Sequence, residues 1–269
     1  MQRKWWIFLL TALIVLAVIG LDQRMIVRTY QVESEKVSAP VRLAVVTDFH
    51  GCDYGEDAAD LVQTVAELQP DAVLLVGDMF SADGEVEAEL RLFSRLKSIA
   101  PSYYVTGNHE YWECDVPHLL ARIADTGVTV LDQNCSELTV NGQNLNLCGI
   151  PDPYANVNTW DALTSATGDL HQEGFTILLA HRPELIEQYA AKGTIDLVVS
   201  GHAHGGQVRI PFLINGLCAP NQGWFPKYAG GRYEVEDTTL IVSRGLSNQR
   251  QMGVPRVFNR PEIVLVELK

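Results

Sequence analysis

The feature that most constrains the fold is an alternation of apolar runs with amphipathic segments in the first half of the chain. Apolar runs typical of buried strands occupy residues 41–47, 72–76 and 103–106. The segments between them, one ending near residue 69 and one at 85–97, carry apolar residues at the spacing of a helical face. Strands that alternate with helices pair in parallel, because each helix crosses back over the sheet. The sequence therefore predicts an α/β fold with parallel strands.

The second half of the chain is richer in predicted strands and contains no internal repeat. Runs typical of strands lie at 128–131, 137–149, 175–180, 195–200, 207–210 and 239–244. The chain has 269 residues, of which 47% are hydrophobic, so it can form one large domain with a substantial core. We expect this domain to span residues 41–269.

Polar residues that can bind metal ions follow five of the predicted strands, at the point where each strand ends. They are Asp48 and His50, Asp78, Asn108 with His109 and Glu110, His181, and His202 with His204. Ligands of open α/β sheets bind beyond the carboxyl ends of strands, so these side chains should meet at one rim. Within each Asp-x-His or His-x-His pair, an extended backbone would point both side chains the same way.

Each of these motifs taken alone also has a structural explanation. Asp-x-His is common, Gly-Asp usually marks a turn, and the segment GlyAsnHisGlu at 107–110 could be a turn followed by a helix cap. The segment GlyHisAlaHisGlyGly at 201–206 is more specific, because two imidazoles and three glycines suit neither a strand nor a core. The ordered set, with every member at a strand end, predicts a metal site.

The same ordered set resembles the calcineurin-like metallophosphoesterase superfamily over residues 42–269. Three longer segments resemble a branch of membrane-anchored bacterial phosphodiesterases, the UDP-2,3-diacylglucosamine pyrophosphatase-like branch. They are TyrTyrValThrGlyAsnHisGluTyrTrp at 103–112, GlyHisAlaHisGlyGlyGlnValArgIlePro at 201–211 and SerArgGlyLeu at 243–246. The resemblance implies a four-layer α-β-β-α sandwich of two mixed sheets stacked face to face.

The resemblance also implies two divalent metal ions that share one ligand. Asp48, His50, Asp78 and His204 would hold one ion, and Asp78, Asn108, His181 and His202 the other. Two such ions roughly 3.5–4 Å apart clamp a phosphoryl group and generate the attacking hydroxide between them. A mixed oxygen and imidazole set suits Mn, Fe, Zn or Co, of which we favour Mn, and is too rich in nitrogen for Ca or Mg. His109 would then be a catalytic residue that donates to a phosphate oxygen or to the leaving group.

The N-terminal run from Trp5 to Leu21 contains neither a charge nor a proline. It is just long enough for a thin hydrocarbon core, and its two tryptophans suit a membrane interface. A cleaved signal peptide is the alternative, but the run is longer than a usual h-region and no A-x-A site follows it. We therefore predict a transmembrane helix in an anchor of residues 1–27, then a linker or an edge strand at 28–40. The protein would be a single-pass cell-membrane protein with an extracytoplasmic catalytic domain.

The charge distribution and one apolar loop bear on the partner. The formal net charge is −13, and residues 41–204 hold 25 acidic residues against seven basic ones, which argues against nucleic acid. The segment 212–228 combines apolar residues with nearby arginines, and Arg209 and Arg244 are the candidate substrate contacts. Such a loop could hold an acyl chain and a phosphate, or its aromatic residues could simply cover a sheet edge. Together with the anchor, it favours a lipid-linked or membrane-proximal phosphoester.

Three functional interpretations follow from these residues. The first is a metal-dependent phosphoric ester hydrolase that cleaves a phosphodiester or pyrophosphate bond. The second is a non-catalytic, membrane-anchored module that binds a phosphorylated ligand through the same metal site, which the presence of His109 disfavours. The third is a structural metalloprotein, but structural zinc sites use four local, cysteine-rich ligands. The five cysteines form no CxxC pair, and their odd number argues against a disulfide framework.

Overall fold

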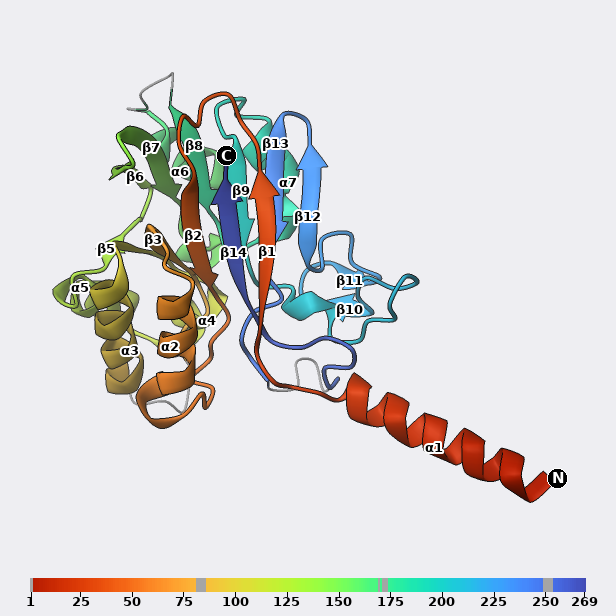
Figure 1. The fold of residues 1–269 in the computed structure, drawn as a ribbon. Coiled ribbons are helices and arrows are strands. Elements are labelled where there is room, and N and C mark those ends of the chain that lie inside the picture. The colour runs from red at the N-terminus through yellow and green to blue at the C-terminus, as the bar shows by residue number, and fades with distance from the viewer. Residues whose placement is uncertain (1, 81–85, 169, 171–173, 249–253) are drawn as a thin grey trace.

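Two β-sheets of six strands each form the centre of the molecule (Figure 1). A computed structural model of the chain describes residues 2–80, 86–168, 170, 174–248 and 254–269. The first sheet has the order β1 (Ile26–Val32), β14 (Glu262–Leu268), β2 (Val41–Val46), β3 (Ala72–Val76), β4 (Ser102–Val105) and β5 (Thr129–Val130). The second has the order β12 (Gly231–Val235), β13 (Thr238–Val242), β9 (Leu197–Ser200), β8 (Phe175–Leu179), β7 (Gln143–Gly149) and β6 (Asn134–Val140). A separate short hairpin pairs β10 (Cys218–Ala219) with β11 (Gly223–Trp224).

Both sheets are mixed, as predicted. In the first, β2, β3, β4 and β5 run parallel, whereas β14 is antiparallel to β2 and parallel to the edge strand β1. In the second, β7, β8, β9 and β13 run parallel, and the edge strands β6 and β12 are antiparallel to their neighbours. The parallel strands are nearly continuous apolar runs, because both of their faces are covered.

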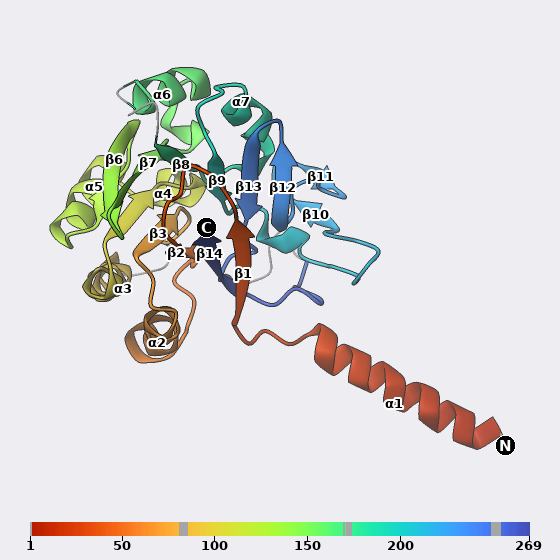
Figure 2. The same cartoon turned by 45° about the horizontal axis from the view of Figure 1, so that its top comes forward.

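Helices cover the two sheets on their outer sides (Figure 2). Three hydrophobic clusters separate the resulting four layers, in agreement with the predicted sandwich. The inner cluster lies between the two sheets and includes the fully buried Leu43 and Leu147. The second includes Leu61 and Phe93 and lies under α2 (Ala59–Glu67), α3 (Val86–Ile99) and α5 (Val116–Asp125). The third includes Leu163 and lies under α6 (Thr159–Ala166) and α7 (Ile186–Ala190). Truncating a core leucine to alanine in such clusters typically costs about 2–5 kcal/mol.

The predicted strands of the first half lie where expected, and two predictions in the second half are wrong. The run at 137–149 is not one strand but the hairpin β6–β7, which turns at Asn141 and Gly142, where φ is 51° and 76°. The segment 207–210 forms only isolated bridges, because Val208 and Ile210 pair with single residues. Of the two alternatives for 28–40, the edge strand is present, since β1 pairs with β14 over seven residues.

The N-terminal helix α1 (Gln2–Gly20) projects from the domain (Figures 1 and 2). Its large hydrophobic side chains are 46–72% exposed. Among the residues that the structure describes, no helix is long and apolar enough to cross a membrane. The transmembrane helix predicted within residues 1–27 is therefore not shown by the structure.

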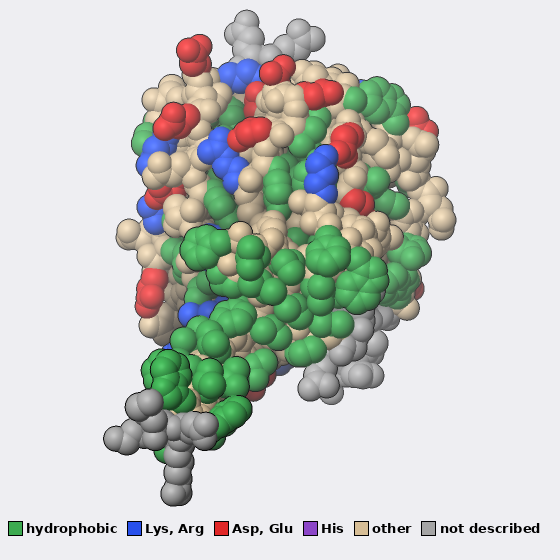
Figure 3. Space-filling view, turned by 90° about the vertical axis from the view of Figure 1, so that its right-hand side faces the viewer, with side chains coloured by type: hydrophobic (Ala, Val, Ile, Leu, Met, Phe, Trp, Pro, Cys, Tyr) green, Lys and Arg blue, Asp and Glu red, His purple; other side chains and the backbone are tan. Residues whose placement is uncertain are grey.

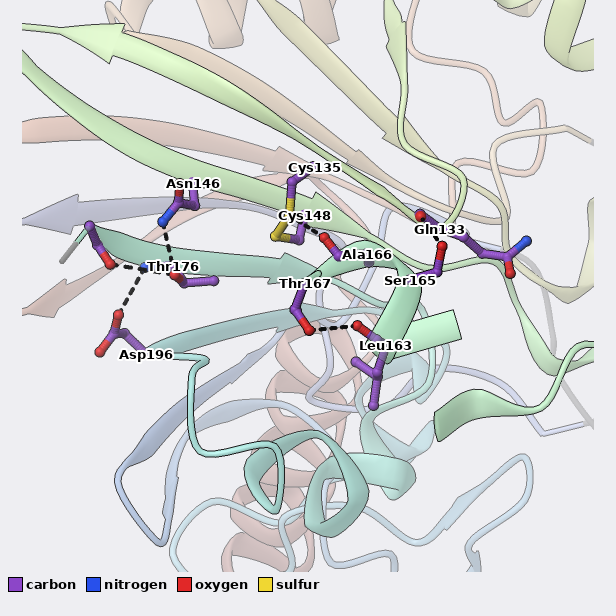
Figure 4. Close-up of a disulfide and its surroundings, with 11 residues drawn as sticks. Gln133, Cys135, Asn146, Cys148, Leu163, Ser165, Ala166, Thr167, Thr176 and Asp196 are labelled. Carbon is purple, nitrogen blue, oxygen red and sulfur yellow. Dashed lines mark hydrogen bonds between the residues drawn. A yellow bond between two sulfur atoms is a disulfide. The ribbon is translucent and has the colours of Figure 1, made fainter. Parts of the chain in front are cut away.

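A disulfide joins two strands of the second sheet, a pairing that the odd cysteine count neither predicted nor excluded. Cys135 in β6 lies directly opposite Cys148 in β7, and their sulfur atoms are bonded (Figure 4). Cys135 Sγ also lies 2.8 Å from the carbonyl oxygen of Ala166, at the end of α6. The bond therefore fastens the edge strand β6 to the sheet, close to the helix that covers it.

We expect the disulfide to contribute measurably to stability. Replacing Cys135 and Cys148 together by alanine should lower the free energy of unfolding by about 2–3 kcal/mol, because the bond closes a loop of 13 residues in the unfolded chain. Urea unfolding followed by circular dichroism measures the change. Dithiothreitol should lower the midpoint of the wild type and leave that of the double variant unchanged. Equal midpoints for the two oxidised proteins would refute a stabilising role.

Candidate metal centre

Five segments, each following a parallel strand, bring the predicted ligands together between the two sheets. The first sheet supplies Asp48 and His50 after β2, Asp78 after β3 and Asn108 after β4, at the start of α4 (Asn108–Glu113). The second supplies His181 after β8 and His202 and His204 after β9. All seven side chains are buried. The strand ends of both sheets therefore bring the six Asp and His residues together, as the sequence predicted.

The donor atoms fall into two groups, each able to hold one metal ion. Asp48, His50, Asp78 and His204 form one group, and Asp78, His181 and His202 the other; within each, one ligand atom per residue lies within 4.8 Å of the rest. Asp78 belongs to both groups. Its Oδ2 lies 3.8 Å from Nε2 of His50 and 3.0 Å from Nε2 of His181, so one carboxylate reaches both. These are the two ligand sets that the resemblance implied, apart from Asn108.

Several buried ligand atoms lack a hydrogen-bond partner, and this pattern fits a metal site. They are Nε2 of His50, Nδ1 of His204 and Oδ1 of Asn108. A buried polar atom without a partner costs about 1–3 kcal/mol, so three in one place call for a ligand that satisfies them. The amide oxygen of Asn108 is among these atoms, so it too is available to a ligand.

The backbone at the ligands differs from the extended conformation that the sequence suggested. Asp48, His50, Asp78, His202 and His204 all have positive φ, between 46° and 65°. The left-handed region is uncommon for residues other than glycine, and such residues concentrate at functional sites. The expected extended backbone is therefore wrong, although Asp48 and His50 do reach the same ligand group. The chain turns sharply at each strand end, and these turns direct the side chains inward.

Two glycines allow the loops to approach the carboxylates. A Cβ atom at Gly107 would lie 2.2 Å from Oδ1 of Asp78, and one at Gly245 would lie 2.5 Å from Cβ of Asp48. Both contacts are far shorter than van der Waals distance, and Gly245 also has a φ of 70°. Any side chain at either position would displace a carboxylate of the centre.

Backbone amides and a hydroxyl orient the two carboxylates. The amide of His202 donates to both oxygens of Asp48 at 3.1 Å, and Thr47 Oγ1 lies 3.1 Å from Oδ2 of the same residue. The amide of His109 donates to Oδ1 of Asp78 at 2.9 Å. Hydrogen bonds of this kind fix the direction in which the remaining lone pairs point.

The orientation of two imidazoles is set by partners on the side away from the centre. Nδ1 of His181 lies 2.8 Å from the carbonyl oxygen of Val76, which leaves Nε2 facing Asp78. Nε2 of His202 lies 2.9 Å from Oδ1 of Asn221. An outer hydrogen bond is the usual way in which proteins fix a metal-binding histidine. Asn221 has no motif around it, so sequence reasoning did not find it.

Burial and neighbouring charges move the pKa values of the carboxylates apart. Burial raises the pKa of Asp48 to about 6, with His181 opposing the shift and Asp78 adding to it. Burial would also raise the pKa of Asp78, but the positive charge of His181, its hydrogen bond and His50 hold it well below its usual range. Burial alone would lower the pKa of His181, but Asp78 and Asp48 outweigh it and raise that pKa to about 10. Metal-free His181 is therefore protonated at neutral pH, and an ion that binds there must displace this proton.

The other three imidazoles are neutral at physiological pH. Burial lowers the pKa of His50 to about 4 and that of His202 to about 3, and it holds the pKa of His204 well below its usual range. A neutral imidazole is the form that binds a metal ion. Three of the four histidines are thus ready to coordinate without losing a proton.

Glu110 is a buried carboxylate that supports the centre and that sequence reasoning did not assign. Its Oε2 accepts from the amides of Gly107 at 2.6 Å and Asp78 at 3.1 Å. Its Oε1 accepts from Met79 at 2.8 Å and Phe80 at 3.4 Å. Burial, followed by the charge of Asp78, raises the pKa of Glu110 to about 7. This side chain both caps α4 at Gly107 and ties it to the loop that carries Asp78.

Replacing Glu110 by alanine should therefore weaken both the fold and the metal centre. Four backbone amides would lose their acceptor, and at about 1–3 kcal/mol for each buried group, partly relieved by relaxation, we expect a loss of about 3–5 kcal/mol. Metal affinity should fall about 10–100-fold, because Asp78 would no longer be fixed. Urea unfolding and a metal titration measure the two effects. Stability and affinity equal to those of the wild type would contradict this role.

His109 lies beside the centre but in neither ligand group. Its ring centroid is 4.4 Å from that of His50 and 4.9 Å from that of Trp112. Trp112 in turn contacts Tyr154 with ring centroids 5.2 Å apart, and these two side chains are 55% and 48% exposed. His109 thus stands between the ligands and an exposed aromatic pair, where a group bound at the centre can meet its ring. Trp112 and Tyr154 were not predicted as site residues.

Arg209 and Arg244, the predicted substrate contacts, lie together but apart from the ligands. Both line a hollow of roughly 620 Å³ that Arg28, Phe258 and the segment 210–215 complete. None of the seven predicted ligands lines it. The hollow and the centre are nevertheless linked through the chain. Arg209 donates to the carbonyl of Gly205, the residue after the ligand His204, and Arg244 precedes Gly245, where a Cβ atom would lie 2.5 Å from Cβ of Asp48.

Comparisons with known proteins agree with this geometry. Residues 41–206 match the calcineurin-like phosphoesterase family. An uncharacterized metallophosphoesterase of Helicobacter pylori is 32% identical over 241 residues, which cover 87% of this chain and 61% of that protein. A protein of Bos taurus described as a transmembrane protein with metallophosphoesterase domain is 29% identical, over 85% of this chain and 53% of its own length. The chain thus spans about half to three fifths of the length of these curated relatives.

A solved structure shows the same fold at low sequence identity. The NAD nucleotidase of Haemophilus influenzae superposes with a TM-score of 0.52 and 14% identity, covering 81% of this chain and 49% of that chain. At this level of identity the likeness concerns the fold alone.

Proposed function

The chain belongs to the calcineurin-like phosphoesterase family, and from this premise we propose that it is a metal-dependent phosphoric ester hydrolase. The bond it cleaves is a phosphodiester or a pyrophosphate. The observation that carries the proposal is the position of Asp78, whose carboxylate lies within 4.8 Å of donor atoms in two separate ligand groups. Such an arrangement suits two neighbouring cations, since a shared carboxylate lowers the repulsion between them.

The residues of the centre fit a pair of divalent ions. Asp48, His50, Asp78 and His204 would hold one, and Asp78, Asn108, His181 and His202 the other. When bound, the ions would supply an activated water and neutralise charge on the phosphoryl group. The mixed oxygen and imidazole donors suit Mn, Fe, Zn or Co, and we propose Mn first.

His109 is proposed as the catalytic residue. Its backbone amide donates to Asp78, which holds the residue at the centre, while its ring lies next to that of His50 and outside both ligand groups. From there the imidazole can donate a proton to a non-bridging oxygen of the phosphoryl group or to the leaving oxygen. Positioned groups of this kind contribute typically about 10²–10⁴-fold to the rate.

We further propose that the substrate is lipid-linked or membrane-proximal and that the domain works outside the cytoplasm. The exposed apolar side chains of α1 and of the loop that contains Phe212 and Trp224 support a membrane-proximal site. The disulfide between Cys135 and Cys148 supports an oxidising compartment, where such bonds persist. The three segments at 103–112, 201–211 and 243–246 are what supports the UDP-2,3-diacylglucosamine pyrophosphatase-like branch.

A hydrolysis screen tests the function. The full chain in mild detergent is loaded with Mn, Fe, Zn or Co and assayed on phosphomonoesters, phosphodiesters, sugar-nucleotide pyrophosphates and phospholipids. A shortened protein should begin near residue 22, so that it keeps strand β1 of the first sheet. We expect metal-dependent turnover of a diester or a pyrophosphate. Binding of phosphate without turnover of any substrate would favour a non-catalytic binding module instead.

A further inference from the structure

An exposed apolar surface lies beside the hollow that contains Arg209. We define the apolar platform as Ile210, Phe212, Leu213, Trp224 and Phe225, which are 42%, 106%, 82%, 68% and 66% exposed. Figure 3 shows a continuous hydrophobic area on this side of the molecule, which extends onto α1. The sequence from residue 210 to 226 contains no charged residue. Soluble proteins rarely expose large contiguous apolar patches, and those they expose usually bind a partner or a membrane.

The platform is held in place by backbone hydrogen bonds. The amide of Leu217 donates to Gly206 at 2.8 Å, and the amide of Phe225 donates to Leu217 at 2.8 Å. Ile210 and Ile214 form a further antiparallel bridge. The exposed side chains therefore project from an ordered segment, so their exposure is a consequence of the folded structure.

The hollow beside the platform carries an excess of positive charge. Glu262, which is fully buried, pairs with Arg28 at 3.2 Å and with Arg244 at 3.3 Å. In the described part of the chain, Arg209 has no carboxylate partner; it donates to the carbonyl of Gly205 at 3.3 Å and to the side chain of Asn215. Arg28 and Arg244 thus share one carboxylate, and Arg209 has none among the described residues. Ile210, Phe212 and Leu213 line the same hollow, so it combines cationic and apolar side chains.

The platform is fastened to the loop that carries two of the candidate ligands. Gly206, which accepts from Leu217, lies two residues beyond His204. Asn221, between the two strands of the β10–β11 hairpin, lies 2.9 Å from Nε2 of His202. The helix α1 leaves the domain on the same side as this hairpin (Figure 1). A flat surface that met the platform would therefore also lie near the metal centre.

We propose that the platform and the arginine hollow form a docking surface for a bilayer that contains anionic phospholipid. The aromatic and aliphatic side chains enter the interfacial region, and Arg209 and Arg244 bind the phosphate of a headgroup. In this arrangement the platform enters only the interfacial region and does not span the bilayer. Docking would deliver a phosphoester from the bilayer to the metal centre, and this consequence rests on the function proposed above. The binding of the platform to the bilayer does not depend on that function.

Hydrogen–deuterium exchange on the full chain separates this surface from α1. The experiment compares vesicles of phosphatidylcholine with about 30% phosphatidylglycerol, vesicles of pure phosphatidylcholine, and buffer. The phosphatidylglycerol gives the first vesicles a negative surface potential. We expect the anionic vesicles to slow exchange in peptides from residues 210–226, and the pure zwitterionic vesicles to slow it less. Protection confined to peptides of α1, or equal protection by both vesicle types, would overturn the proposal. The proposal would also be overturned if residues 210–226 exchanged slowly in buffer and their exchange became faster when the protein was diluted. A second copy of the chain would then cover the platform.

Paired variants connect the binding to the platform itself. Replacing Phe212 and Leu213 together by serine should weaken binding to anionic vesicles at least about tenfold, because two apolar side chains no longer leave water. Replacing Trp160 by serine removes an exposed aromatic residue on α6 and should change nothing. Equal binding by the double variant and the wild type would overturn the proposal. Absence of turnover on a soluble diester by wild type would instead count against the proposed function and leave the binding result standing.

Discussion

Replacing Asp78 by asparagine is expected to abolish turnover and to remove at least one metal ion from each chain. Asparagine keeps the volume and the acceptor that the amide of His109 uses, 2.9 Å from Oδ1. It loses the negative charge and the second donor oxygen, which lies near both His50 and His181. Metal assistance is worth several kcal/mol of barrier, which corresponds to about 10³-fold or more in rate.

A second effect of the same change distinguishes it from simple misfolding. Because Asp78 is the main cause of the raised pKa of His181, the variant should bind metal at the second group with less proton release near neutral pH. Isothermal titration in buffers of different ionisation enthalpy measures that release. Asp196→Asn is a suitable control, since Asp196 accepts from the amide of Thr176 at 2.8 Å outside both ligand groups. If the Asp78→Asn variant kept its full metal content and turnover, Asp78 would not be a metal ligand.

Replacing His109 by alanine is expected to lower turnover by about 10²–10⁴-fold while both ions stay bound. The physical reason is that its ring lies beside the ligands without belonging to either group, and its backbone amide, which holds Asp78, is kept in the variant. The effect should appear in kcat more than in KM, because a proton is needed in the transition state and not in binding.

Elemental analysis of the His109 variant separates the two explanations of a low rate. Unchanged metal content with low turnover assigns a catalytic role, whereas loss of metal would move His109 into the ligand set. His118→Ala serves as the matched control, since His118 is an exposed histidine on α5 that lies outside both ligand groups. If the control loses as much activity as the His109 variant, the effect is not specific to the centre.

The ligand set could be predicted because each member ends a run of buried residues. Such a run is visible in sequence, and the rule that ligands lie beyond the carboxyl ends of parallel strands then brings the ends together. The conformation at those ends could not be predicted. Positive φ at residues such as Asp48 and His204 costs local energy, and it persists because the surrounding hydrogen bonds and close glycine contacts hold it.

Residues that support the ligands were harder to find. Glu110 occupies the third position of a helix that begins after Gly107, which is a capping signal, but its bonds to the loop after β3 depend on packing. Asn221 lies 19 residues from His202 in a segment with little regular structure. Neither contact follows from local spacing, because each joins two loops that only the folded sheets bring together.

The sequence contains a turn signal from which the disulfide could have been predicted. Asn141-Gly142 is a strong signal for a two-residue hairpin turn, and it lies within the run that was interpreted as one strand. With the turn in place, Cys135 and Cys148 face each other across β6 and β7. A correct hairpin prediction would have paired these two cysteines.

The central claim is a centre for two metal ions that share Asp78, and metal stoichiometry tests it most directly. The full chain is stripped with a chelator, titrated with Mn²⁺, desalted and measured by elemental analysis against protein concentration, with turnover of a chromogenic diester followed in parallel. We predict two ions per chain at saturation, and activity that rises with the second ion. Saturation at one ion, or full activity in the stripped protein, would contradict the claim.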